Sequence, residues 1–224
     1  MIDRLGAFRE RLTSPRPVLL DGAMGTALIA RGLDVSRQRA PEWSISRPEE
    51  VLSVHRAHVV AGAELVLTNT FLRPTDDECQ ASLRLARASG ARLVGASLYA
   101  GLEDLGRCVR ALAGADVIWL ETATSVEQGE RALAIALRET SLPVVLTLAA
   151  FVVDDASEGR PGVLRGYNCG PWASLPRARV LKLDTGGREP EAWARLLVRS
   201  GAQLLGGCCG ATPLHIGALA KALC

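Results

Sequence analysis

The feature that most constrains the fold of this 224-residue chain is a regular alternation of two kinds of segment. Short runs rich in Val, Leu and Ile alternate with amphipathic stretches, which is typical of a parallel α/β sheet built from strand–helix units. Most of the short runs are apolar throughout, as expected for strands that helices cover on their outer face. Eight such strands in one chain of this length favour a closed (β/α)8 TIM barrel over an open sheet. The predicted strands are Val18–Leu20, Leu65–Thr68, Leu93–Ser97, Val117–Glu121, Val144–Leu148, Leu164–Asn168, Val180–Leu183 and Gln203–Gly206.

The predicted helices are less evenly distributed than the strands. They cover Arg4–Leu12, Pro48–Ala61, Asp76–Ser89, Leu102–Ala113, Val126–Thr140, Pro190–Ser200 and Pro213–Leu223. Phe151 to Val163 and Gly170 to Arg179 are too short and too rich in Gly, Pro or Asp for full helices. We therefore predict a compact barrel, one domain over residues 1–224, with shortened or missing helices after strands five and six. Apolar strand surface left uncovered there predicts a homo-oligomer.

Composition excludes several classes of function. Hydrophobic residues make up 48% of the chain, so a sizeable core is expected, and the net charge is only +2. No block of Lys and Arg suggests nucleic acid as a partner. No apolar run reaches the roughly 18 residues of a membrane span, and the N-terminus does not resemble a signal peptide. We expect a cytoplasmic protein without nucleic-acid or membrane partners.

The six cysteines differ in their placement. Cys79, Cys108 and Cys224 stand alone and are interpreted as buried or incidental residues. Cys169 follows strand six, and the pair Cys208-Cys209 follows strand eight. In a barrel these strand ends converge, and three thiolates would bind Zn²⁺ and leave one position open.

The glycines around the adjacent pair bear on this prediction. Neighbouring side chains of a regular strand point to opposite faces, so both sulfurs reach one metal only where the backbone bends. Gly206, Gly207 and Gly210 allow such a bend. Two alternatives stay open, a vicinal disulfide and simple packing of two small residues.

Two carboxylates also lie at predicted strand ends. Asp21 begins a Gly-rich turn after strand one, and Glu121 ends strand four. Two acids beside exposed turn amides suit an amino-acid substrate, whose ammonium the acids would hold and whose carboxylate the amides would hold. Structural roles are equally open: Asp21 could be an N-cap or turn residue, and Glu121 could belong to an ion pair. His55 and His58 are interpreted as surface or packing residues, with metal binding as the alternative. His215, at the start of the last helix, is open between a structural role and a contact to a phosphate-type group.

The motifs taken together resemble the homocysteine S-methyltransferase family, which includes betaine and S-methylmethionine enzymes and the homocysteine-binding module of cobalamin-dependent methionine synthase. The matching segments, in family order, are Leu19-Leu20-Asp21-Gly22-Ala23-Met24-Gly25-Thr26, Ala61-Gly62-Ala63-Glu64, Thr68-Asn69-Thr70-Phe71, Leu120-Glu121-Thr122, Asn168-Cys169 and Gly206-Gly207-Cys208-Cys209-Gly210-Ala211-Thr212-Pro213. The resemblance implies a TIM barrel that binds Zn²⁺ through Cys169, Cys208 and Cys209.

The resemblance also implies a set of substrate contacts. Asp21 and Glu121 would hold the ammonium of homocysteine, and the amides of Gly22 and Ala23 its carboxylate; Thr70 completes the predicted substrate-binding set. No catalytic side chain beyond the metal site is predicted, because the metal-bound thiolate is itself the nucleophile. The predicted reaction forms methionine.

Departures from the family concentrate in the loops. The segments after strands two, three, five and six are short, and Leu183-Asp184-Thr185-Gly186-Gly187 replaces the usual Pro-Asn-x-Gly after strand seven. The donor therefore stays open between S-methylmethionine, S-adenosylmethionine, betaine and a methylated corrinoid protein. Two alternatives to the predicted activity are a methyltransferase for another small thiol or selenol, and a non-catalytic barrel that binds zinc or thiols.

Overall fold

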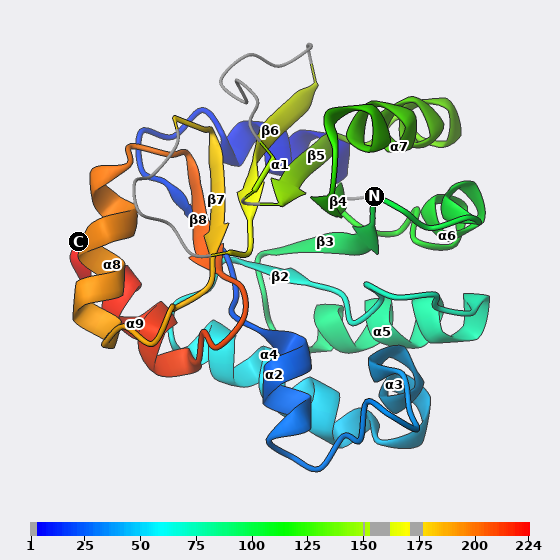
Figure 1. The fold of residues 1–224 in the computed structure, drawn as a ribbon, viewed down its shortest axis with the longest axis horizontal. Helices are drawn as coiled ribbons and strands as arrows, with labels where there is room; N and C mark the ends of the chain where they lie inside the picture. The colour runs from blue at the N-terminus through cyan, green and yellow to red at the C-terminus, as the bar shows by residue number, and fades with distance from the viewer. Residues whose placement is uncertain (1–3, 150, 153–161, 171–176) are drawn as a thin grey trace.

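In the computed structural model the eight strands form one parallel sheet that curves into a barrel (Figure 1). The structure describes residues 4–149, 151–152, 162–170 and 177–224. The strands are β1 (Val18–Leu19), β2 (Leu65–Leu67), β3 (Leu93–Tyr99), β4 (Val117–Ala123), β5 (Val144–Ala149), β6 (Val163–Asn168), β7 (Val180–Leu183) and β8 (Leu204–Gly207). Neighbours pair in sequence order, and β8 pairs with β1. A bridge between Leu20 and Leu65 links β1 to β2 at the remaining edge. The predicted TIM barrel is confirmed.

The helices lie outside the strands. They are α1 (Arg4–Arg11), α2 (Met24–Ile29), α3 (Trp43–Ser46), α4 (Pro48–Val60), α5 (Asp76–Ala88), α6 (Leu105–Ala111), α7 (Val126–Glu139), α8 (Pro190–Arg199) and α9 (Pro213–Ala222), with a short 3₁₀ turn at Ala40–Glu42. Contacts join α8 to α9, α9 to α4, and then α4 through α5 and α6 to α7 (Figure 1). The seven predicted helices are confirmed to within a few residues, whereas α2, α3 and the 3₁₀ turn were not predicted. In the described residues, no helix is long and apolar enough to cross a membrane.

The described part of the wall between α7 and α8 contains β5, β6 and β7 without an intervening helix. Most of the two predicted short connections, residues 153–161 and 171–176, lies outside the described residues. Every residue of β5 and β7 is buried, and β6 is buried except at the half-buried Arg165. The exposed apolar strand surface that motivated the oligomer prediction is therefore not observed in these strands.

The core has two main layers. Alternate strand residues fill the barrel interior around Trp119, and Phe8 of α1 packs into the same cluster. The opposite strand faces pack against the outer helices. Because the interior is filled with apolar side chains, polar groups that serve chemistry are confined to the ends of the strands.

Candidate metal and acceptor site

A cavity of about 450 Å³ opens at the carboxyl ends of the strands. Its walls combine the residues predicted from strand ends with a segment that follows α2. The polar part includes Asp21, Ser97, Glu121, Asn168, Lys182 and the cysteines 169, 208 and 209, and the apolar part includes Leu33, Val35, Pro41, Phe71 and Leu72. A cavity of this size, mostly apolar with a few converging polar groups, is typical of a small-molecule site.

Three cysteines meet in this cavity. The Sγ atoms of Cys169 and Cys209 are 3.5 Å apart, and those of Cys169, Cys208 and Cys209 all lie within 4.8 Å of one another. Four thiolates around a tetrahedral Zn²⁺, with Zn–S bonds of about 2.3 Å, have sulfurs about 3.8 Å apart. The observed spacing therefore fits one metal ion, and all three cysteines are free thiols rather than a disulfide. Within the described residues, no other group of His, Cys, Asp or Glu side chains has this spacing.

The backbone brings the three sulfurs together by two bends. Cys169 has a left-handed φ of 55°, and its amide donates to the carbonyl of Lys182 in the next strand. At the end of β8 the amide of Ala211 donates to the carbonyl of Cys208, so the chain turns back at the cysteine pair. A Cβ at Gly207 would lie 2.2 Å from Cβ of Ala211, so only glycine permits this close return.

The clustered thiols share protons. Hydrogen bonds from Cys169 and Cys208 lower the pKa of Cys209 to about 3, while the same cluster raises the pKa of Cys169. A thiolate is the form that binds a metal. The cluster therefore favours the thiolate form of Cys209, the form that a metal ion binds.

The two predicted carboxylates lie in the same cavity and are both buried. Oδ2 of Asp21 accepts a hydrogen bond of 2.8 Å from the amide of Leu67, while Oδ1 is buried without a partner. Burial raises the pKa of Asp21 to about 7, against the opposing effects of the Lys182 charge and the Leu67 amide. Asp21 is thus not the N-cap that its position in a Gly-rich turn left open.

Glu121 is held by side chains of β3 and β7, and the residue that follows it is held by β6. Its Oε1 accepts a hydrogen bond of 2.6 Å from the hydroxyl of Ser97, and its Oε2 lies 3.4 Å from Nζ of Lys182. The next residue, Thr122, has a left-handed φ of 60° at an irregularity of β4, and the side chain of Asn168 pairs with both its amide and its hydroxyl. This clamp fixes the direction of the strand end that carries Glu121.

Lys182 is the site residue that the sequence did not predict. It is the third residue of β7, it is 6% exposed, and it lines the cavity between the carboxylates and the cysteines. Burial alone would lower the pKa of Lys182, but the charges of Glu121 and Asp21 outweigh burial and raise it. A lysine inside the apolar run Val180-Leu181-Lys182-Leu183 was the available signal, because a buried lysine requires a paired anion.

Two of the predicted substrate contacts involve groups that have hydrogen-bond partners within the chain. The hydroxyl of Thr70 donates to the carbonyl of Ser97 at 2.7 Å and lies 2.6 Å from the hydroxyl of Thr68, and Thr70 is not among the residues that line the cavity. The amide of Ala23 donates to the carbonyl of Ala211 at 3.0 Å and is not available to a carboxylate. Gly22 lines the cavity, and a Cβ there would lie 2.4 Å from the carbonyl oxygen of Ala211. The turn therefore requires glycine. That the Gly22 amide holds the substrate carboxylate stays a prediction.

The histidines are structural. His55 and His58 of α4 are fully buried rather than on the surface, and the Nε2 of His58 lies behind Gly22. His215 accepts a hydrogen bond from the amide of Thr212 at the start of α9, and its Nε2 lies 3.2 Å from the carbonyl of Arg188. Of the two roles open for His215, these contacts support the structural one. Cys79 and Cys108 are buried, as predicted.

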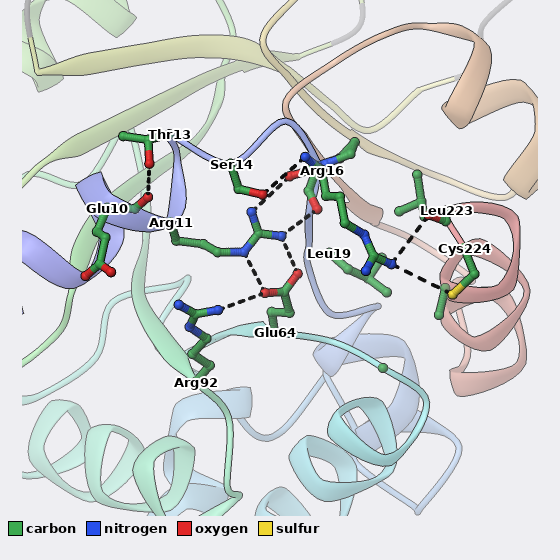
Figure 2. A pocket seen from close by; sticks show the side chains of 13 residues that line it. Glu10, Arg11, Thr13, Ser14, Arg16, Leu19, Glu64, Arg92, Leu223 and Cys224 are labelled. Carbon is green, nitrogen blue, oxygen red and sulfur yellow. Dashed lines mark hydrogen bonds and ion pairs between the residues drawn. The ribbon is translucent and has the colours of Figure 1, made fainter.

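A second cavity of about 560 Å³ lies at the opposite, amino end of the barrel (Figure 2). Arg11 forms its centre, and both carboxylate oxygens of Glu64 accept hydrogen bonds from Arg11, at 2.6 and 2.7 Å. The remaining guanidinium hydrogen bonds run to the carbonyls of Arg16 and Pro17. This network ties the chain before β1 to the start of β2, so we interpret it as a structural element.

Comparison with known proteins places these features in a family. The sequence profile of the family described as homocysteine S-methyltransferase matches residues 18–101 and 167–223. The chain belongs to the homocysteine S-methyltransferase family. Asp21, Lys182 and the three clustered cysteines lie inside the matched ranges, whereas Glu121 lies between them. The chain is therefore a methyltransferase, and methyl transfer to homocysteine is the activity that this family describes.

Individual relatives agree with the family. The S-methylmethionine–homocysteine S-methyltransferase BHMT2 of Mus musculus is 26% identical over 96% of this chain and 80% of its own length, and BHMT2 of Rattus norvegicus matches equally. The apo crystal structure of the homocysteine methyltransferase MmuM of Escherichia coli superposes with a TM-score of 0.75 at 24% identity, covering 99% of this chain and all of that one. A metallated form of MmuM gives a TM-score of 0.74 at 22% identity over 96% of this chain and 99% of that one. These structures share the fold of this chain.

Proposed function

We propose that the protein transfers a methyl group from a small sulfonium donor to the thiol of homocysteine on a Zn²⁺ ion held by Cys169, Cys208 and Cys209. One observation carries the proposal: three free thiols with the spacing of metal ligands line the same cavity as two buried carboxylates. Three protein ligands leave a fourth position for an incoming sulfur, as in catalytic rather than structural zinc sites.

The donor set supports zinc. Three thiolates are soft ligands, which favour Zn²⁺ over the hard cations Mg²⁺ and Ca²⁺. When bound, zinc would keep the substrate thiol deprotonated at neutral pH. Nearby, Asp184 accepts a hydrogen bond of 3.0 Å from the amide of Gly170, next to Cys169. This bond steadies the left-handed turn that carries the first sulfur.

The protein's own residues would position the acceptor. With its sulfur at the cysteine cluster, homocysteine would place its amino-acid end toward Asp21, Glu121 and Gly22, which line the inner part of the cavity. Fixing both ends of a small substrate raises the rate because little orientational entropy is then lost at the transition state. No side chain needs to act as a general base, since the nucleophile is already a thiolate.

The other part of the cavity supports a small donor. Leu33, Val35, Phe71 and Leu72 form an apolar wall beside the polar groups. A sulfonium carries a positive charge without hydrogen-bond donors, so apolar and aromatic surface such as the ring of Phe71 suits it. The curated relatives are named for S-methylmethionine, which makes this donor the first to test.

The reaction is a displacement that balances without a redox partner. The acceptor sulfur forms a bond to the methyl carbon as the bond from that carbon to the donor sulfur breaks, and the electron pair leaves with the donor sulfur. With S-methylmethionine and homocysteine, both products are methionine. The proton of the acceptor thiol passes to solvent when the thiol binds.

The test is a donor screen on protein whose metal is controlled. Protein stripped with a chelator and reloaded with Zn²⁺ should form methionine from homocysteine and S-methylmethionine, and the stripped protein should not. S-adenosylmethionine, betaine and a methylated corrinoid protein are run in parallel.

Each outcome has a defined meaning. Turnover only with the corrinoid protein would refute the small donor but keep the acceptor site. Binding of zinc and homocysteine without transfer from any donor would support the non-catalytic alternative. Transfer to another small thiol or selenol, but not to homocysteine, would refute the proposed acceptor.

A further inference from the structure

Lys182 contributes a fixed positive charge where the substrate's amino group was expected. Its strand is paired on both sides, with Asn168 opposite in β6 and Gly206 in β8. The side chains of Lys182 and Glu121 are 8% and 7% exposed, and Nζ lies 3.4 Å from Oε2. A buried charge without a partner is strongly unfavourable, because it has lost its hydration. At this distance each of the two buried ions therefore stabilises the other.

The oxygens of the two carboxylates are largely committed to groups of the chain. Glu121 accepts from Ser97 with one oxygen and lies against Lys182 with the other. Asp21 accepts from the amide of Leu67 with Oδ2, and its Oδ1 has almost no accessible surface. A substrate ammonium would therefore find no carboxylate oxygen that is both exposed and free.

The charge of the site gives the same result. Asp21 and Glu121 would carry two negative charges when both are ionised. The positive charge of Lys182 interacts with both, so the net charge of the three side chains is then −1. A substrate ammonium must lose its hydration to enter, and its attraction to this site is weakened by the lysine already present. A thiol without an amino group avoids that cost and leaves the existing ion pair intact.

We propose that Lys182 is a specificity-determining residue that supplies the cation for Asp21 and Glu121 from the protein itself. The site consequently methylates ω-thiol carboxylates without an α-amino group in addition to homocysteine. This inference rests on the proposed function, since it takes the same cavity to be the acceptor site. The chemical step is unchanged: the acceptor sulfur bonds to the methyl carbon, and the donor sulfur leaves with its electron pair.

The experiment compares two acceptors that differ by one group. 4-Mercaptobutyrate is homocysteine without its amino group, so the ratio of kcat/KM for the two thiols measures the contribution of the ammonium. In Zn²⁺-loaded wild type we expect the two values to agree within about tenfold. Lys182→Met should raise the ratio in favour of homocysteine by about tenfold or more, because Asp21 and Glu121 then need a cation from the substrate. Lys182→Arg keeps the charge and should leave the ratio within about threefold of wild type.

A binding measurement separates this inference from the proposed function. Protein loaded with Co²⁺ is titrated with each thiol in the absence of donor, and thiolate coordination is followed by its charge-transfer absorption. If neither thiol changes the spectrum, the proposed acceptor site itself is wrong. If homocysteine binds more than about 1,000-fold better than 4-mercaptobutyrate to wild type, the site is right and the role of Lys182 is refuted. The role of Lys182 is also refuted if folded, metal-loaded Lys182→Met has the same ratio of kcat/KM for the two thiols as wild type. If that variant does not fold, the ratio measured for wild type decides the question.

Discussion

The two ends of the barrel contain cavities of similar size and opposite character. At the amino end, every guanidinium nitrogen of Arg11 has a partner, and so do both oxygens of Glu64 (Figure 2). At the carboxyl end, three free thiols with the spacing of metal ligands face one another. Paired groups stabilise a fold, whereas groups without partners have interactions left to offer a ligand.

Cavity volume does not separate the two ends. The amino-end cavity measures about 560 Å³ and the carboxyl-end cavity about 450 Å³, so size alone would select the wrong one. The kind of side chain and its state of pairing are more informative. We therefore expect substitutions at the two ends to affect different measurements, activity at the carboxyl end and stability at the amino end.

The largest effect is expected from removing one sulfur of the cluster. Cys208→Ser should lower bound zinc to less than about a tenth of an equivalent and lower kcat/KM more than roughly 1,000-fold, or about 4 kcal/mol, because the remaining sulfurs cannot complete the metal site. Metal analysis and methionine formation measure the two quantities.

Cys224→Ser is the matched control for this variant. Cys224 is exposed and lines the amino-end cavity, at the opposite end of the barrel from the cluster. The control should keep its zinc and its activity. Equal losses in both variants would mean that general thiol chemistry, rather than the cluster, holds the metal.

The next largest effect is expected at the amino end, on stability alone. Arg11→Met removes a buried side chain that donates to Glu64 and to two carbonyls, which should lower the free energy of unfolding by about 3 kcal/mol. Urea denaturation measures this loss, while zinc content and kcat of the folded fraction should stay at wild-type values. If Arg11→Met had normal stability but impaired turnover, the structural role assigned to the amino end would be wrong.

The sequence was sufficient to predict the framework that separates these ends. All eight strands were predicted because fully buried parallel strands are continuous apolar runs, and Cys169, Cys208 and Cys209 followed from the convergence of their ends. The helices α2 and α3 were missed. They are short, six and four residues, and pack through a separate cluster around Leu28 and Trp43, so their apolar periodicity is too brief to recognise.

The details of the acceptor site were less predictable, because they depend on contacts between distant segments. Thr70 was expected to touch substrate, but its hydroxyl is taken by the carbonyl of Ser97, 27 residues along the chain. The amide of Ala23 was expected to be free, but the carbonyl of Ala211 accepts from it. Lys182 was overlooked since only the fold shows that its strand brings it to Glu121, 61 positions away.

The smallest predicted effect concerns a buried histidine of α4. Both ring nitrogens of His55 are buried without a partner, and burial, followed by the nearby charge of His58, lowers the pKa of His55 to about 3. The unfolded chain binds a proton at this residue near its ordinary pKa of 6.5, but the folded chain does not until about 3. Above pH 6.5 His55 is neutral in both states and the free energy of unfolding is not reduced by its protonation. As the pH drops from 6.5 toward 3, proton binding to the unfolded chain lowers the free energy of unfolding. His55→Leu lacks this proton linkage, so relative to wild type it should gain roughly 2.7 kcal/mol in the free energy of unfolding between pH 8 and pH 4.5. Urea denaturation at the two pH values measures the gain. A difference between variant and wild type that stays constant with pH would show that His55 is paired in the folded chain.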